Sequence, residues 1–201
     1  MRHCPEIINL VGLYFSNNAN EIRDWLLSEF EGFPPTYPGG SHVTKYYAYY
    51  NYLMMTFPGM TDLFHNIRET FHTCNHIVWD GNPPNREYFI QAWLNYYTKG
   101  EKINWHNHLP AEADAWHGFY CVDVEPNSHT SYKIHNDQLD VKSEDNLLVM
   151  GRSGDDYHRS SDWNEDKPRI TIAFDISPVK NFTGCVHYRN EKGRIHYWIP
   201  I

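Results

Sequence analysis

Residues 97–108, YTKGEKINWHNH, place two histidines one residue apart in a segment rich in β-forming residues. Successive side chains of a strand point to opposite faces, so His106 and His108 are predicted to share one face of a strand. Two imidazoles on one face can bind the same metal ion. A distant histidine, His158, would complete three protein ligands and leave positions open for substrate or oxygen, which is typical of a catalytic iron site.

The second part of the pattern lies downstream, where Arg169 follows His158 by eleven residues. His158 stands in a polar segment, GRSGDDYHRSSDW, which predicts a loop. In the segment PRITIAF, strand alternation places Arg169, Thr171 and Ala173 on one face and the apolar residues on the other. An arginine on the inner face of a barrel strand requires an anion. The anion is either a carboxylate of the protein itself or a dicarboxylate cosubstrate, whose carboxylate the planar guanidinium matches.

From residue 88 onward the sequence consists of strand-length segments separated by Gly, Pro, Asn or Asp. The segments are YFIQAWLNYY, KINWHNH, WHGFYCVDV, SYKIH, NLLVM, RITIAFDI, CVHYR and RIHYWIPI. About eight strands with few helices is the count of a double-sheet jelly roll, so we expect a mainly β protein with a cupin-like double-stranded β-helix. The last two segments flank residues 190–193 and predict a hairpin that adds edge strands.

The N-terminal part of the chain is predicted to support this β-rich core. Residues 7–15 form an apolar run typical of a strand, and helical spacing of apolar residues predicts helices over 17–30 and 60–74. Residues 32–40, GFPPTYPGG, predict a connector or a mobile lid. Three histidines on or after the second helix are expected to be solvated or capping rather than metal ligands: His65, His72 and His76.

We expect the 201 residues to form one domain. Its predicted parts are an N-terminal support over 1–87, the double-stranded β-helix over 88–177 and a C-terminal hairpin over 178–201.

The charge and the cysteines restrict the partners and the compartment. With 17 Lys and Arg against 25 Asp and Glu, the formal net charge is −8, which disfavours nucleic acid and anionic membranes as partners. The four cysteines show no CxxC spacing, and the N-terminus MRHCPEIINLVGLYF lacks the features of a signal peptide. A reducing cytoplasm is therefore the predicted location. No segment approaches the roughly 18 apolar residues of a membrane helix.

The pattern YxxGxxxxxHxH, a distal histidine, and an arginine eleven residues on that is followed by xThr resemble the Fe(II)/2-oxoglutarate-dependent oxygenases. The resemblance is to the prolyl-hydroxylase-like branch and to uncharacterised members from bacteria and bacteriophages, and it covers residues 88–177. It implies a double-stranded β-helix that uses ferrous iron, 2-oxoglutarate and dioxygen, with ascorbate as an accessory. The implied reaction hydroxylates a small-molecule or peptide substrate and converts 2-oxoglutarate to succinate, in a host cytoplasm if the gene belongs to a bacteriophage.

The resemblance also implies roles for individual residues. His106 and His158 match the two iron histidines, Arg169 and Thr171 match the clamp on the distal carboxylate of 2-oxoglutarate, and Tyr97 matches a tyrosine that contacts this cosubstrate.

The sequence departs from the family at position 108, where the HxD motif has aspartate and this chain has histidine. An all-histidine site carries one negative charge fewer than the site of the family, which lowers its affinity for Fe(II). Either His108 replaces the acid, or Glu112 or Asp114 supplies it. Strand geometry favours His108, because it already points to the face of His106.

A second interpretation is based on the same residues. Residues 100–118 contain GxxxxxHxHxxxExxxxxG, which is similar to the first motif of cupins, although the last spacing is one residue short and the proline of the second motif is missing. The ligands would then be His106, His108, Glu112 and His158. Such a cupin-type enzyme or metal-binding module would have no obligatory use for Arg169 and Thr171. A β-helix without catalytic activity is the third class. Three aromatic residues are expected either to line the pocket or to fill the core: Trp105, Trp116 and Tyr120.

Overall fold

The computed structural model describes residues 10–14, 18–29, 43–45, 51–56, 58–134, 137–154, 157–181, 187–189 and 195–201. The proline- and glycine-rich segment 32–40, interpreted above as a connector or a lid, lies outside these residues.

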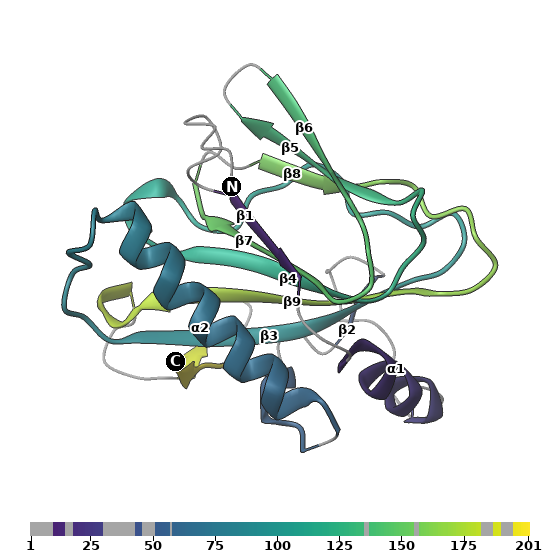
Figure 1. Ribbon diagram of the computed structural model, residues 1–201, viewed down its shortest axis with the longest axis horizontal. Helices are drawn as coiled ribbons and strands as arrows, with labels where there is room; N and C mark the ends of the chain where they lie inside the picture. The colour runs from purple at the N-terminus through teal and green to yellow at the C-terminus, as the bar shows by residue number, and fades with distance from the viewer. Residues whose placement is uncertain are drawn as a thin grey trace.

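The larger of two facing β-sheets is antiparallel and has seven strands (Figure 1). Its order is β1 (Leu10–Tyr14), β7 (Leu147–Arg152), β4 (Trp116–Asp123), β9 (Arg169–Pro178), β3 (Tyr88–Tyr97) and β12 (Ile199–Pro200), with β2 (Thr44–Lys45) also pairing with β3. The two central strands β3 and β9 are paired along ten residues and are buried almost throughout. Both faces of these two strands are therefore covered.

The smaller sheet has the order β6 (Asp137–Lys142), β5 (His129–Ile134), β8 (Tyr157–Ser160). A buried cluster joins the sheets: Tyr132 from β5 packs with Trp93, Phe119 and Val149 from the large sheet. The two sheets thus form the double-stranded β-helix, and the fold predicted from the sequence is confirmed. The remaining strands, β10 (His187–Arg189) and β11 (Ile195–Tyr197), form a separate two-stranded ribbon.

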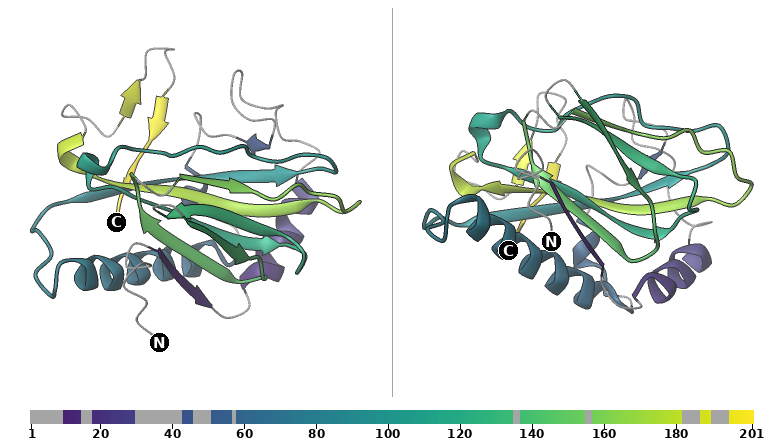
Figure 2. Two further views of the ribbon diagram at one scale, coloured as in Figure 1. Left: turned by 90° about the horizontal axis from the view of Figure 1, so that it is seen from above. Right: turned by 45° about the horizontal axis from the view of Figure 1, so that its top comes forward.

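Two helices cover the outer face of the large sheet. These are α1 (Asn18–Glu29) and α2 (Met60–Val78), and α2 runs diagonally across the strands in Figure 1. Their buried side chains, among them Ile22 and Phe71, pack against Trp116, Leu148 and Phe174 of the sheet. Figure 2 shows both helices on the side of the sheet away from β5, β6 and β8. Short 3-10 turns occupy Tyr52–Met54, Ala111–Ala113 and Val179–Asn181.

Strand β9 separates the helix-facing core from the interior between the sheets. Its residues Ile170, Ile172, Phe174 and Ile176 belong to the core beneath the helices. The alternate residues point into the space between the sheets, as expected for a strand. These are Arg169, Thr171, Ala173 and Asp175, all buried. The predicted alternation of β9 is confirmed, and it places Arg169 in the interior.

Four local features differ from what the sequence predicted. Residues 102–108 do not form a regular strand; they run along β8 through isolated backbone bonds. His158 lies in strand β8 rather than in a loop, and it is 8 % exposed. The segment carrying β6 alternates between exposed and partly buried residues, so its low hydrophobicity concealed a strand. In the C-terminal region it is β12 that extends the large sheet, by pairing with β3, whereas the β10–β11 hairpin does not.

The three histidines of α2, His65, His72 and His76, are exposed, as expected. No helix among the described residues is long and apolar enough to cross a membrane.

Gly118 in β4 allows close packing in the core beneath the helices. A Cβ at this position would overlap the carbonyl oxygen of Val149 and approach Phe174 Cζ to 2.5 Å. We therefore expect Gly118→Ala to lower the free energy of unfolding by about 1–3 kcal/mol, the usual cost of overpacking a core. Urea denaturation followed by circular dichroism measures this change. An unchanged midpoint would contradict the close packing of β4 on β7 and β9.

Candidate metal centre

His106 and His158 are held together by their backbones. His106 N–H donates to the His158 carbonyl and His158 N–H donates to the His106 carbonyl, both at 2.9 Å. Residues paired in this antiparallel manner project their side chains to the same side. The two ring centroids are accordingly 4.3 Å apart. A single bridge, rather than a strand ladder, brings these imidazoles together.

His108 completes a three-histidine cluster. Its ring centroid lies 5.2 Å from that of His106 and 5.3 Å from that of His158. One nitrogen from each of the three rings lies within 4.8 Å of the others, so a single metal ion can be held among them. The three histidines therefore lie close together, as predicted. Residues 102–108, however, do not form the strand that was expected to bring them together.

The surroundings prepare two of the rings to bind a metal. His106 Nδ1 lies 2.8 Å from the Asn104 carbonyl, which can only accept, so Nδ1 carries the proton and Nε2 keeps a free lone pair. Burial lowers the pKa of His106 to about 4, so this ring is neutral at pH 7. His108 Nδ1 lies at ion-pair distance, 2.8 Å, from Asp175 Oδ1, which makes no hydrogen bond within the described residues; this placement leaves Nε2 of His108 available for a metal.

Neither of the acids proposed as a substitute for the missing aspartate joins the cluster. Asp114 is bound by Arg86 at 2.8 Å, Lys180 at 2.8 Å and Arg152 at 3.0 Å. Burial alone would raise its pKa, but hydrogen bonds from Lys180 and Arg86 outweigh burial and lower it. Glu112 is exposed on the turn Ala111–Ala113. Among the described residues, the group able to hold a metal consists of the three histidines alone.

Two further residues of the site were not recognised from the sequence. His117 is 2 % exposed and stacks on His158 at 4.6 Å and on His108 at 5.0 Å. Asp175, directly opposite His117 in the β4–β9 pairing, touches His108. Strand alternation offered the signal for Asp175, because it continues the inward series from Arg169. For His117 the local sequence offers no comparable signal.

Arg169 is a buried cation without an anionic partner among the described residues. Its side chain is 1 % exposed, and Nη2 donates to Ser143 Oγ at 3.3 Å. Its Nε and Nη1 have no hydrogen-bond partner in the described part of the chain. A buried guanidinium with two unsatisfied donors is costly unless a ligand completes it. The structural salt bridge considered for Arg169 is therefore not found within those residues.

The other predicted cosubstrate residues surround this guanidinium. The Tyr97 ring is 5.0 Å from Arg169 Cζ, and its hydroxyl interacts with Ser160 and Thr171. Burial raises the pKa of Tyr97, which keeps its phenol protonated at neutral pH. Thr171 is 2 % exposed and pairs with Cys121 on β4, whose thiol pKa burial raises to about 11. The structure thus brings Tyr97, Arg169 and Thr171 together on the inner face.

The three aromatic residues left open between pocket and core take different places. Trp116 and Tyr120 belong to the core beneath the helices, on the face of β4 opposite His117. Trp105 stacks on Tyr157 at 5.7 Å, beside rather than within the histidine cluster. Two of the three therefore fill core.

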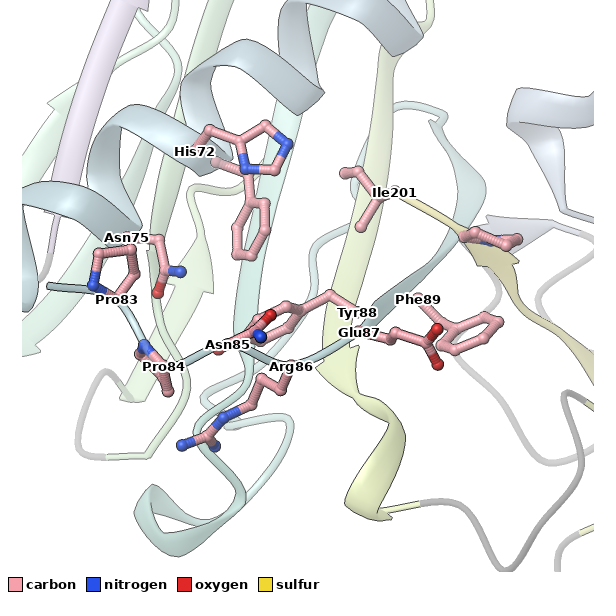
Figure 3. A pocket seen from close by; sticks show the side chains of 12 residues that line it. His72, Asn75, Pro83, Pro84, Asn85, Arg86, Glu87, Tyr88, Phe89 and Ile201 are labelled. Atoms are coloured by element: carbon pink, nitrogen blue, oxygen red, sulfur yellow. The ribbon is translucent and has the colours of Figure 1, made fainter.

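A pocket between the end of α2 and the start of β3 is separate from this site. It is lined by Phe71, His72, Pro83, Tyr88 and Ile201, among others (Figure 3). Phe71 and Tyr88 belong to the core beneath the helices, so this pocket opens on the face of the large sheet opposite the histidines.

No protein-family model and no curated protein matches the sequence. Solved structures do match. A prolyl hydroxylase from Trichoplax adhaerens, in complex with a hypoxia inducible factor peptide fragment, has a TM-score of 0.64 at 10 % identity, covering 88 % of this chain and 87 % of that chain. HygX from Streptomyces hygroscopicus, with nickel and 2-oxoglutarate bound, has a TM-score of 0.58 at 12 % identity, covering 85 % and 83 %. A viral collagen prolyl hydroxylase from Paramecium Bursaria Chlorella virus-1, as a 2-oxoglutarate complex, has a TM-score of 0.58 at 10 % identity, covering 84 % and 95 %.

The architecture and the comparisons agree on the class of fold. The protein is a double-stranded β-helix with a three-histidine cluster in its interior. More specifically, it has the fold of the Fe(II)/2-oxoglutarate oxygenases, as the sequence motifs predicted.

Two substitutions test whether His108 or Glu112 is the third metal ligand. We expect His108→Asp to retain or strengthen Fe(II) binding, because a carboxylate adds negative charge to a site of three neutral ligands. Glu112→Gln is the matched control and should leave the dissociation constant unchanged, because Glu112 is exposed outside the cluster. Anaerobic Fe(II) titration measures both variants. Loss of metal from Glu112→Gln alone would instead favour the cupin-type ligand set.

Proposed function

We propose that this protein is an Fe(II)- and 2-oxoglutarate-dependent oxygenase that hydroxylates a small-molecule or peptide substrate. One observation carries the proposal: Arg169 is buried in the interior with Nε and Nη1 unsatisfied among the described residues. The unsatisfied donors of a buried guanidinium can pair with a carboxylate in charge-assisted hydrogen bonds. The neighbouring fold relatives include proteins solved with 2-oxoglutarate bound.

The residues present fit the metal and the cosubstrate. His106, His108 and His158 would hold iron through their nitrogens, which lie within 4.8 Å of one another. With 2-oxoglutarate and dioxygen, the iron would supply the oxidant for C–H hydroxylation, and 2-oxoglutarate would leave as succinate and carbon dioxide.

The side chains of the protein would bind and orient the cosubstrate and shield it from water. Arg169 would receive the distal carboxylate of 2-oxoglutarate, with the Thr171 hydroxyl as a second donor and the Tyr97 ring against the guanidinium. The buried position of these three residues excludes water, which strengthens each polar contact with the cosubstrate. The Asn104 carbonyl holds the proton of His106 on Nδ1, away from the metal.

The decisive experiment is an anaerobic titration of the Fe(II) protein with 2-oxoglutarate. Bidentate chelation produces a visible metal-to-ligand charge-transfer band, which we expect to saturate at one 2-oxoglutarate per chain. Succinate formation with candidate substrates, with and without ascorbate, then measures turnover. An iron-loaded protein that neither develops the band nor consumes 2-oxoglutarate would refute the oxygenase proposal.

One observation favours a second candidate, a cupin-type metalloenzyme that does not use 2-oxoglutarate. The donor set is three imidazoles with no carboxylate among the described residues. That function predicts stoichiometric metal binding in a protein that is indifferent to 2-oxoglutarate. The same titration therefore separates the two candidates.

A further inference from the structure

The negative charge that is missing from the metal ligands is present one side chain further away. The cluster offers three imidazoles in place of two imidazoles and a carboxylate. The side chain of Asp175 is 7 % exposed, and its Oδ1 lies at ion-pair distance, 2.8 Å, from His108 Nδ1, although Oδ1 makes no hydrogen bond within the described residues. With Nδ1 facing the carboxylate, Nε2 is the nitrogen of His108 that remains available to a metal.

Asp175 occupies a central position that leaves it few partners. It lies on β9 between Gln91 of β3 and His117 of β4, in the middle of the large sheet. Within the described residues, no lysine or arginine forms an ion pair with it, and His108 is the basic group within ion-pair distance. A buried carboxylate is costly when its charge is uncompensated. A divalent cation on the far side of His108 would supply that compensation.

Other contacts already orient the His108 ring. Trp93 stacks on it with centroids 5.7 Å apart and planes at 23°, and His117 stacks on it at 5.0 Å and 8°. Because two rings fix the plane of His108, the main effect of Asp175 is its charge. A carboxylate within ion-pair distance of Nδ1 favours a proton on that nitrogen and increases the basicity of the opposite one, which is then available to a metal.

We propose that Asp175 is a positioning residue of the metal centre, which acts through His108 and supplies from outside the ligand set the negative charge that position 108 lacks. This proposal rests on the metal centre of the proposed function. It assigns Asp175 a role different from a purely structural buried acid, and the two roles predict different responses to substitution at position 108.

The first test is the isosteric substitution Asp175→Asn, which removes the charge and keeps the shape. We expect the metal to bind about 10- to 100-fold more weakly, the usual effect of losing such a partner of a ligating histidine. Competition with a chromophoric chelator, using Zn(II) and anaerobic Fe(II), measures the dissociation constant. The matched control is Asp123→Asn, a buried aspartate paired with Lys167, which should leave metal affinity unchanged.

The second test repeats Asp175→Asn in the His108→Asp background. If Asp175 acts through the imidazole of His108, Asp175→Asn should have little effect in the His108→Asp background. In that background the carboxylate introduced at position 108 binds the metal directly, and no imidazole is left for Asp175 to act through. A structural role predicts the same loss of affinity in both backgrounds, and that result would overturn the proposal.

Spectroscopy supplies a readout that packing does not change. Without the nearby charge, the iron is less electron-rich, so the charge-transfer band of the 2-oxoglutarate complex should move to shorter wavelength in Asp175→Asn. If Asp175→Asn binds both Fe(II) and 2-oxoglutarate and its charge-transfer band stays at the wild-type wavelength, the proposal is contradicted.

Wild-type protein provides a measurement that does not depend on how variants fold. With Zn(II) bound and histidines labelled with ¹⁵N, His108 should show a protonated Nδ1 and a metal-bound Nε2, with its signals identified by their loss in His108→Asp. Absence of these signals would overturn the role of Asp175. Absence of any metal binding by wild-type protein would instead overturn the metal centre itself, so the two failures are distinguishable.

Discussion

His158→Ala is expected to reduce bound iron from about one ion per chain to nearly none, because two remaining imidazoles form an incomplete site. His158 is the most buried of the three histidines and is the one joined to His106 through paired backbone bonds. Those bonds use main-chain atoms, so the substitution removes the ligand and leaves the bridge that positions His106. The folded structure should therefore persist.

Metal analysis after anaerobic loading and dialysis measures the effect, with circular dichroism to verify the fold. His65→Ala is the matched control, because His65 is exposed on α2 and belongs to no metal-ligand group of the described residues. Full iron occupancy in folded His158→Ala would remove this histidine from the ligand set.

Arg169→Ala is expected to weaken 2-oxoglutarate binding about 30- to 150-fold, which corresponds to the roughly 2–3 kcal/mol of a charge-assisted pair. Iron affinity should barely change, since the guanidinium is not a ligand. Arg169→Lys should restore only part of the affinity, because an ammonium keeps the charge but lacks the planar fork. The charge-transfer titration measures all three proteins, and Arg68→Ala, on the exposed surface of α2, is the control. Equal affinity in all of them would exclude a cosubstrate role for Arg169.

Arg169→Met separates a ligand clamp from a structural ion pair. With Nε and Nη1 unsatisfied among the described residues, the charge of Arg169 costs stability in the ligand-free protein. We expect Arg169→Met to keep or raise the melting temperature without 2-oxoglutarate and to lose the stabilisation that 2-oxoglutarate gives the wild type. A large loss of stability without ligand would show that Arg169 has a structural partner.

The sequence alone was sufficient for the architecture and for part of the site. The spacing of strand-length segments predicted the double-stranded β-helix, and helical periodicity predicted α1 and α2. Alternation along β9 placed Arg169 and Thr171 on the inner face, because a strand has only two faces and one of them is lined with Ile and Phe. These features depend on local geometry, which short-range sequence patterns record.

Other features depend on contacts between distant parts of the chain, so only the tertiary structure decided them. The irregular segment 102–108 gains its shape from bonds to β8, and the strand character of His158 comes from pairing with β5. His117 and Asp175 join the site because β4 and β9 lie side by side, although 58 residues separate them in sequence. The sequence by itself determined which faces are apolar and which residues can bind a metal or a carboxylate. Long-range pairing decided which of those residues meet, because the distance between two side chains across a sheet is fixed by strand order and register, not by their separation along the chain.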